Sequence, residues 1–172
     1  MKLPTQKQCF DLWDKYQMPE NIKAHSRQVT KVADAIALHL EKQGLLLNKE
    51  LINRGALMHD IAKIIAVNEN RERDHSEMGS EIALRENLGN EISEIIRKHY
   101  MSTFNDQCTL EEQVVNYADK RVTHDRIVAL TERFDYICKS YPAATRNIME
   151  NKQKYLGFEK KYQIDQLDLM ER

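Results

Sequence analysis

One stretch of the chain, residues 55–67 (Gly-Ala-Leu-Met-His-Asp-Ile-Ala-Lys-Ile-Ile-Ala-Val), restricts the fold more than any other. It is apolar on all sides of any helix it forms, and its polar side chains, His59, Asp60 and Lys63, lie within about one helical turn. A helix that is hydrophobic all round is usually buried. Burying an imidazole, a carboxylate and an ammonium group costs free energy unless each has a partner or binds a metal ion. The stretch predicts a buried helix that carries either a core-stabilising hydrogen-bond network or a functional site.

The composition is typical of a globular, nearly all-helical protein. The chain has 172 residues, of which 41% are hydrophobic and 31% are charged, and it contains only five glycines and three prolines. This length is enough for one domain with a sizeable core. We therefore expect residues 1–172 to form a single, soluble all-α domain.

Charge and cysteine content exclude several classes of partner. The formal net charge of −1 gives no electrostatic reason to expect binding to nucleic acid or to an acidic membrane. Three widely spaced cysteines, with no Cys-x-x-Cys pair, predict neither a disulfide framework nor a thiolate zinc site. The N-terminus has no apolar leader segment, and no stretch is long enough to cross a membrane. We expect a cytoplasmic protein with no membrane partner.

Capping residues mark the starts of several helices. Asn48 can cap the central helix, and capping boxes begin at Thr109 and, less clearly, at Asp74. The second of these boxes places His75 in the first turn of its helix. Asp125 is expected to cap a further helix over about residues 127–141.

Several helices place an unusual polar residue on an apolar stripe. The residues are His25, His59 with Asp60, His99 and Asp119. A lone histidine in such a position is more often a hydrogen-bonded core residue. Several that converge inside a bundle are typical of a metal site built from facing helices. Imidazole and carboxylate ligands suit divalent iron, manganese, zinc, cobalt or nickel.

These residues follow the order found in the HD-domain superfamily of metal-dependent phosphohydrolases, which the chain resembles over about residues 18–140. Residues 21–29 (Asn-Ile-Lys-Ala-His-Ser-Arg-Gln-Val) resemble the family's first-histidine helix, and residues 57–63 (Leu-Met-His-Asp-Ile-Ala-Lys) resemble its signature. The segments with His75, His99 and Asp119 are similar to those of its six-ligand, two-metal branch. That branch includes diadenosine-polyphosphate hydrolases and cyclic-dinucleotide phosphodiesterases. The resemblance implies an HD-domain bundle of about seven or eight helices, with an N-terminal helix and a C-terminal helical extension.

The resemblance also implies a ligand set for two divalent ions. One ion would be held by His25, His59, Asp60 and Asp119, and the second by His75 and His99 with Asp60 bridging. A carboxylate has two oxygens, so Asp60 can serve both ions. Two such ions bind a phosphoryl oxygen and lower the pKa of a shared water, which then attacks phosphorus. Asp60 and Lys63 are the catalytic candidates, Lys63 for phosphate contact or leaving-group charge. The alternative for Lys63 is a lysine whose stem covers the helix end.

Two features depart from the family's commoner patterns. Ala62 stands where glycine is commoner, so the backbone there is expected to differ slightly. The Gly-Tyr-Pro signature of the cyclic-dinucleotide enzymes is absent, which weakens the case for that substrate.

Three further patterns are not expected to form metal sites of their own. His39 lies about 21 Å along the helix from His25, too far to share an ion. The His124-Asp125 pair follows a charged turn rather than an apolar helix. Glu72-x-x-His75 lacks the second pair that a ferritin-like di-iron site needs.

Cationic residues cluster in sequence around the last two candidate ligands. They are Lys98, Lys120, Arg121, Arg126 and Arg133. All but Arg133 are expected to be ordinary solvated charges. Arg133 could reach a phosphate or a carboxylate, and Arg126 would share the face of Asp119 if the helix were continuous. The candidate substrate-binding residues are Lys63, Arg133 and Arg126.

The sequence therefore indicates a metal-dependent phosphohydrolase that cleaves a phosphoester or phosphoanhydride of a small nucleotide-like substrate. The alternatives are a nucleotide-binding sensor module without turnover, a mononuclear nucleotidase or triphosphohydrolase, and a purely structural bundle. A small phosphorylated molecule is the expected partner, and a homodimer is compatible with the sequence.

Overall fold

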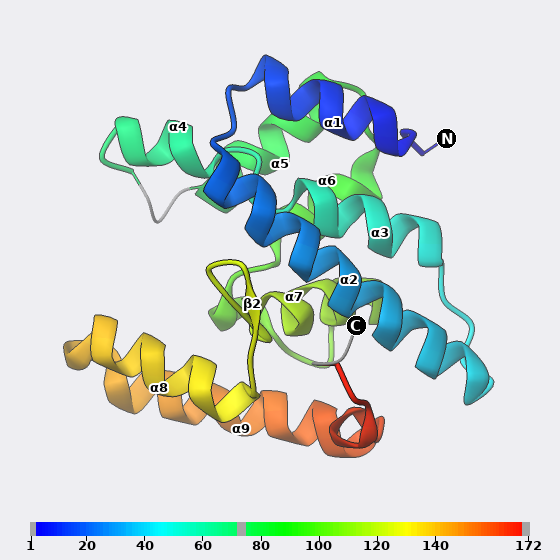
Figure 1. Ribbon diagram of the computed structural model, residues 1–172, viewed down its shortest axis with the longest axis vertical. Coiled ribbons are helices and arrows are strands. Elements are labelled where there is room, and N and C mark those ends of the chain that lie inside the picture. The colour runs from blue at the N-terminus through cyan, green and yellow to red at the C-terminus, as the bar shows by residue number, and fades with distance from the viewer. Residues whose placement is uncertain (1–2, 72–74, 170–172) are drawn as a thin grey trace.

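The computed structural model describes residues 3–71 and 75–169, and in this part of the chain almost all regular structure is helical (Figure 1). The expected all-α fold is confirmed. Within these residues there are nine α-helices: α1 (Gln6–Lys15), α2 (Glu20–Lys42), α3 (Lys49–Met58), α4 (Lys63–Asn68), α5 (His75–Arg85), α6 (Asn90–Arg97), α7 (Leu110–Asp119), α8 (Leu130–Ser140) and α9 (Thr145–Lys161). Short 3-10 turns are η2 (Met101–Thr103), η3 (Pro142–Ala144) and η4 (Ile164–Gln166).

The central apolar stretch is divided rather than forming one helix. α3 ends at Met58, and the six-residue α4 begins at Lys63. The division gives nine α-helices in the described residues, one more than the seven or eight expected. The intervening turn closes through i→i+3 bonds, from Ile61 N to Met58 O and from Lys63 N to Asp60 O, both 3.0 Å. The tighter turn changes the chain direction, and α4 leaves α3 at an angle (Figure 1).

A second difference lies after α7: the helix expected over about residues 127–141 is present, but it begins later and Asp125 does not cap it. Residues 122–127 form a hairpin of β1 (Val122–Thr123) and β2 (Arg126–Ile127), with Val122 paired to Ile127. β-Branched residues favour the strands, and His124 adopts a left-handed φ of 56° in the two-residue turn. The next helix, α8, begins only at Leu130.

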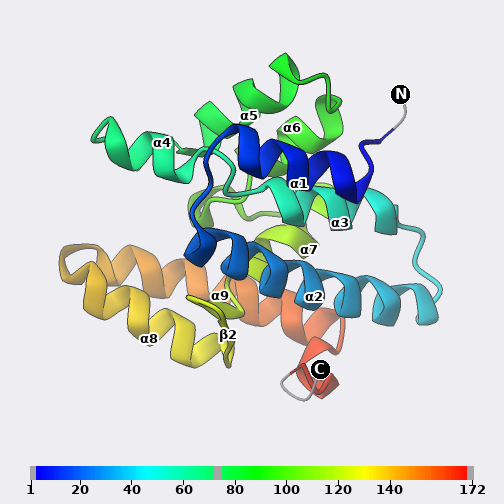
Figure 2. The same ribbon diagram turned by 45° about the horizontal axis from the view of Figure 1, so that its top comes forward.

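The hydrophobic core runs through the bundle from α1 to the segment after α9. α2 packs on α3 and α7, α5 packs on α6, and α8 packs on α9 (Figure 2). Large buried side chains include Trp13, Ile36, Met58, Ile96 and Phe134. Phe10 of α1 is exposed, in contrast to the buried Trp13.

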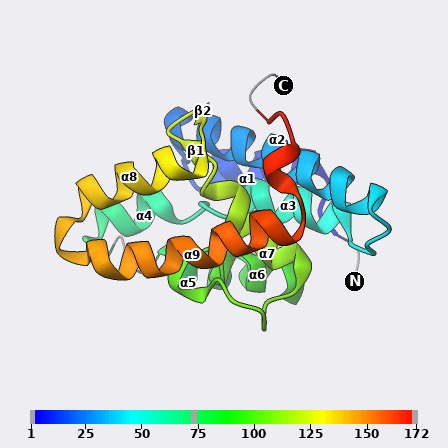
Figure 3. The same cartoon turned by 90° about the horizontal axis from the view of Figure 1, so that it is seen from below.

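α4 and the α8–α9 pair extend to the same side of the molecule (Figures 1 and 3). The signature turn at 59–62 and the β1–β2 hairpin lie at the base of these elements. Across residues 3–71 and 75–169, no helix has the length and apolar character to cross a membrane.

Candidate functional site

All six candidate ligand residues meet in one cluster. His25 comes from α2, His59 and Asp60 from the signature turn, and His75 from the first residue of α5. His99 lies two residues after α6, and Asp119 is the last residue of α7. All are buried except His75, which is half-buried. The cluster thus joins five parts of the chain that are separated by up to 94 residues in sequence.

Asp60 lies between two pairs of imidazoles and directs a different oxygen to each. Its Oδ2 lies 3.5 Å from His59 Nε2 and 3.8 Å from His25 Nε2. Its Oδ1 lies 3.6 Å from His75 Nε2 and 3.7 Å from His99 Nε2. The atoms of each three-residue group lie close enough together to hold a metal ion. The arrangement is compatible with a bridging carboxylate.

Asp119 adds a second carboxylate on the side of His25 and His59. Its Oδ1 lies 3.0 Å from His25 Nε2 and 3.8 Å from His59 Nε2. Its Oδ2 accepts a hydrogen bond from Lys120. Three residues, His25, His59 and Asp119, therefore lie on the Oδ2 side of Asp60, and two, His75 and His99, lie on the Oδ1 side.

Backbone carbonyls orient three of the four imidazoles. His25 Nδ1 donates a hydrogen bond to His124 O (2.8 Å), His59 Nδ1 to Ala56 O (2.7 Å) and His99 Nδ1 to Ile96 O (2.5 Å). A carbonyl only accepts, so each Nδ1 carries the hydrogen and each Nε2 presents a lone pair to the cluster. Among the described residues, the buried Nε2 of His59 has no hydrogen-bond partner. These orientations and donor types fit a divalent metal ion.

The electrostatics of the cluster favour neutral imidazoles at His59 and His99 and ionised carboxylates at Asp60 and Asp119. Burial, then the neighbouring His59, lowers the pKa of His99 to about 3, and burial also lowers the pKa of His59. Burial would raise the pKa of Asp60, but Lys63 and the surrounding histidines hold it well below its usual value. Burial would likewise raise the pKa of Asp119, but Lys120 and His25 hold it well below its usual value. These are the protonation states that metal binding requires.

Each buried carboxylate is paired with a lysine. Lys63 Nζ lies 2.8 Å from Asp60 Oδ2, and its side chain is 43% exposed, so it reaches from the cluster toward solvent. Burial opposes the charge on Lys63, but Asp60 and Asp119 raise the pKa of its ammonium group. Lys120 is only 6% exposed and also donates to His99 O at 3.3 Å. Its pairing with Asp119 links that carboxylate to the backbone beside His99.

The expectation that Lys120 and Arg121 are solvated is wrong. Arg121 is buried and donates to Val128 O at 2.8 Å and to the Tyr117 hydroxyl at 3.0 Å. Lys98 is partly buried and pairs with Glu112 at 2.9 Å. These cations stabilise the structure around the cluster. This burial could not be read from the sequence, because it depends on how the end of α7 packs against other elements and not on the partners nearby in the chain.

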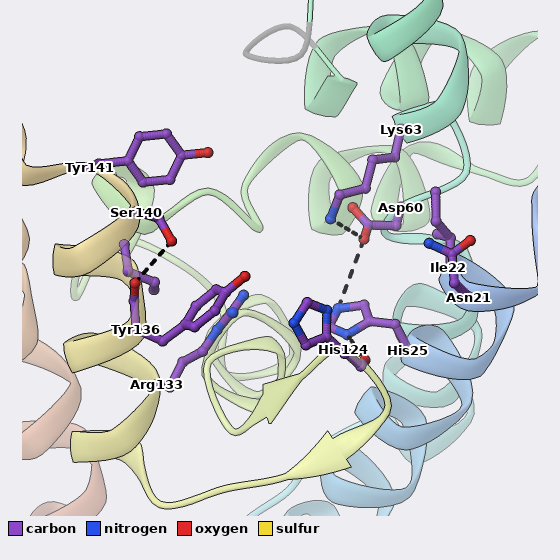
Figure 4. Close-up of a pocket in the computed structure, with 11 residues that line it drawn as sticks. Asn21, Ile22, His25, Asp60, Lys63, His124, Arg133, Tyr136, Ser140 and Tyr141 are labelled. Atoms are coloured by element: carbon purple, nitrogen blue, oxygen red, sulfur yellow. Dashed lines mark hydrogen bonds and ion pairs between the residues drawn. The ribbon is translucent and has the colours of Figure 1, made fainter.

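A cavity of about 320 Å³ opens beside the cluster (Figure 4). His25, Asp60 and Lys63 line one wall, and Arg133 of α8 faces them from the opposite wall. In the described part of the chain, no group hydrogen-bonds to the buried Nε of Arg133. Arg133 is therefore placed as expected for a group that binds an anion.

The structure does not bring Arg126 to this cavity. Arg126 lies on β2, is exposed, and pairs with Glu132 at 3.2 Å. The hairpin redirects the chain after Asp119, so the helical continuation that would have aligned the two residues does not exist.

The other histidine patterns have structural roles. His39 Nε2 contacts Tyr162 O at 3.0 Å, away from the cluster. His124 borders the cavity and packs edge-on against Tyr136, with ring centroids 5.6 Å apart. Its carbonyl orients His25, a contribution that the sequence did not reveal. Glu72 and Asp74, which belong to two of the sequence patterns, lie outside the described residues.

α9 supports the segment that carries His99. The Tyr155 hydroxyl donates to Asn116 Oδ1 at 2.6 Å. The Asn116 amide donates to Lys98 O at 2.7 Å and to Tyr100 O at 2.9 Å, on either side of His99. The C-terminal extension is therefore coupled to one of the candidate ligands through a buried hydrogen-bond chain.

The fold and the cluster define an all-α protein whose buried imidazoles and carboxylates can hold divalent metal. The family model described as the HD domain matches residues 22–123, more than half of the chain, and the chain belongs to this family. HD domains bind divalent metal ions and form a superfamily of metal-dependent phosphohydrolases. The match ends before α8, so α8 and α9 lie beyond the matched residues.

Several curated proteins are similar to the chain at low identity. A tRNA (cytidine(56)-2'-O)-methyltransferase from Picrophilus torridus is 26% identical over 77% of this chain and 40% of its own length. A ribonuclease Y from Treponema denticola is 28% identical over 84% of this chain and 26% of its own length. An uncharacterized protein from Methanocaldococcus jannaschii is 25% identical over 77% of this chain and 86% of its own length. The chain thus spans less than half the length of each of the two relatives whose names give an activity. No solved structure matches the chain.

Proposed function

We propose that the protein is a metal-dependent phosphohydrolase that cleaves a phosphoester or phosphoanhydride of a small nucleotide-like substrate with a metal-activated water. The observation that carries the proposal is the position of Asp60. It directs one oxygen to each pair of imidazoles, and it lines the cavity that Lys63 and Arg133 also face.

We assign two divalent ions, drawn from iron, manganese, zinc, cobalt or nickel, to the cluster. His25, His59, Asp60 and Asp119 would hold one ion, and His75, His99 and Asp60 the other. Such ions supply Lewis-acid chemistry, because they lower the pKa of a bound water and polarise a phosphoryl oxygen. The resulting assignment belongs to the six-ligand branch of the family.

The cationic side chains then bind and orient the substrate. Lys63 and Arg133 lie on opposite walls of the cavity, so a phosphate between them meets positive charge from both sides. Lys63 is also placed to offset the charge that develops on a leaving group. The cavity, at about 320 Å³, is at the small end of the usual range for ligand sites, which supports a small substrate.

Hydrolysis assays test the proposal directly. Protein stripped with a chelator and reloaded with each of the five metals would be incubated with a generic phosphodiester and a panel of nucleotides. We expect metal-dependent hydrolysis that is lost in a variant carrying both His59→Ala and Asp60→Ala. His39→Ala is the matched control, because His39 lies away from the cluster.

Three outcomes would redirect the proposal. Full activity in the double variant would overturn it. Metal-dependent nucleotide binding without hydrolysis would favour a sensor module. Full activity with a single bound ion would favour a mononuclear nucleotidase or triphosphohydrolase.

A further inference from the structure

The outer part of the cavity has a different character from the part next to Asp60. Two large aromatic side chains, Tyr136 of α8 and Tyr141 directly after it, line the cavity together with Arg133. Ile22 lies on the opposite wall (Figure 4). Tyr136 is 41% exposed and Tyr141 is 57% exposed, so their rings are accessible to a ligand.

The position of α8 is set by its own core contacts rather than by these tyrosines. Leu130 and Phe134 are buried and anchor α8 to the bundle. Tyr136 packs edge-on against His124, and the Arg133 guanidinium lies 5.7 Å from the centre of the Tyr136 ring. Tyrosine loses little conformational entropy when it binds, because it has few rotatable bonds. The anchored helix therefore presents aromatic surface beside an anion-binding cation.

Charged groups face each other across the cavity, and the aromatic surface lies on the α8 side. Asp60 and Lys63 lie on one wall, and Arg133, Tyr136 and Tyr141 lie on the facing wall (Figure 4). A ligand whose phosphate lies between Lys63 and Arg133 can extend its remaining atoms past Tyr136 toward Tyr141. At about 320 Å³, the cavity suits one sugar and one ring system better than two nucleosides.

We propose that Tyr136 and Tyr141 form a ring-binding subsite that makes the protein prefer phosphorylated ligands with a planar aromatic base, the mononucleotides, over sugar phosphates of equal length. Tyr141 supplies the ring that stacks on the base, and Tyr136 positions Arg133. This inference rests on the proposed function, since the phosphate must bind beside Asp60. The subsite is formed by α8 and the residue directly after it, which lie outside the residues that the family model matches.

Binding of a matched pair of ligands to the manganese-loaded protein tests the subsite. AMP and ribose 5-phosphate carry the same sugar phosphate and differ at C1′, where AMP carries the base. Each is used as the phosphonate in which a methylene replaces the bridging ester oxygen, so that the protein cannot hydrolyse it, and calorimetric titration of each then isolates the contribution of the ring. We expect AMP to bind roughly tenfold more tightly, as is typical of a base stacked on one aromatic side chain.

Variants of Tyr141 provide the controls. Tyr141→Ala should remove most of the preference for AMP and leave the affinity for ribose 5-phosphate unchanged, which also shows that the variant is folded. Tyr141→Phe keeps the ring and should keep the preference. An undiminished preference in Tyr141→Ala would overturn the role of Tyr141.

The two proposals fail in different ways. Equal, manganese-dependent affinities of the unmodified protein for AMP and ribose 5-phosphate would overturn the ring subsite alone. If manganese promotes the binding of neither ligand, the phosphate site and the ring subsite are both wrong.

Discussion

At the scale of single residues, the cluster is held together by pairing each buried carboxylate with several cations or imidazoles. Asp60 is 1% exposed and Asp119 is 6% exposed, and an unpaired carboxylate at such a depth would cost several kcal/mol. Lys63 and Lys120 offset that cost in the metal-free protein. Burial lowers the pKa values of His59 and His99 and so keeps these imidazoles neutral, and the site is therefore prepared to exchange part of this pairing for metal ions.

The two arginines of α8 and β2 make a matched pair of tests. Arg133→Ala should raise the KM for the hydrolysed nucleotide about tenfold or more, because a hydrogen bond to a charged group contributes roughly 1.5–3 kcal/mol. Arg126→Ala should leave the KM unchanged, since Arg126 is exposed and pairs with Glu132. Steady-state kinetics on both variants measures this. An equal effect of the two substitutions would show that Arg133 has no specific contact with the phosphate.

The depressed pKa values of the histidines predict how stability depends on pH in chelator-treated protein. The pKa of His99 is about 3 in the folded chain and about 6.5 in the unfolded chain, so the unfolded state binds the proton first as the pH falls. The stability that His99 contributes is complete above pH 6.5 and is lost toward pH 3. The slope is up to about 1.4 kcal/mol per pH unit for one proton.

Urea unfolding between pH 7.5 and 4.5 measures this slope. His59, whose pKa is also lowered, adds to it. The contributions of Asp60 and Asp119 are lost only at lower pH, because their pKa values lie well below 3.8. A His99→Gln variant should show a shallower slope. The same slope in both proteins would contradict the assigned protonation state of His99.

At the scale of elements, the break between α3 and α4 gives the signature its geometry. In a straight helix, His59 and Asp60 would point about 100° apart. The turn at residues 59–62 lets both side chains enter the cluster while Lys63 starts a new helix. Ala62, at φ −95°, has an ordinary backbone conformation, so the turn does not require glycine at this position.

Close helix packing predicts opposite effects for two glycine substitutions. A Cβ at Gly55 of α3 would lie 2.7 Å from Ile95 Cγ2 and 2.9 Å from Ile95 Cδ1 of α6. Gly55→Ala should destabilise the protein by about 1–3 kcal/mol, as overpacking usually does. Gly157 of α9 has no described neighbour within 4 Å of such a Cβ, so Gly157→Ala should stabilise by about 0.5–1 kcal/mol. Urea unfolding of both variants tests the pair, and a stabilising Gly55→Ala would contradict the packing of α3 on α6.

Local signals in the sequence predicted elements well, and long-range packing decided the rest. Asn48 and Thr109 cap α3 and α7 as expected, because a cap depends on residues three positions apart. The division of α3 from α4 left no clear local signal, since residues 56–67 contain neither proline nor glycine. The β1–β2 hairpin was missed because Asp125 is equally compatible with a helix cap and a turn.

At the scale of the whole molecule, the cluster forms where α2, α7 and the segments that flank α5 and α6 converge. Inward-facing stripes indicated His25, His59 with Asp60, His99 and Asp119, and the resemblance to the HD-domain superfamily added His75. They could not show which oxygen of Asp60 faces which imidazole, or that Lys120 and the carbonyl of His124 complete the site. These contacts depend on the relative placement of distant elements.

Metal binding to the folded state should stabilise the whole domain. A free metal concentration of 100 times the dissociation constant adds about 2.7 kcal/mol of stability at a single site. For a chain of this size that corresponds to a rise in Tm of roughly 5–10 °C. Thermal melts of chelator-treated protein with and without manganese measure the rise, and Asp60→Ala should abolish it. A Tm that does not respond to any of the five metals would contradict a specific metal site.

Anomalous diffraction from crystals of metal-loaded protein tests the role of Asp60 most directly. We predict two peaks, one beside Asp60 Oδ2 with His25, His59 and Asp119, and one beside Asp60 Oδ1 with His75 and His99. Density for metal only at other places on the protein, or none within coordinating distance of Asp60, would contradict the proposal that this carboxylate joins two metal ions.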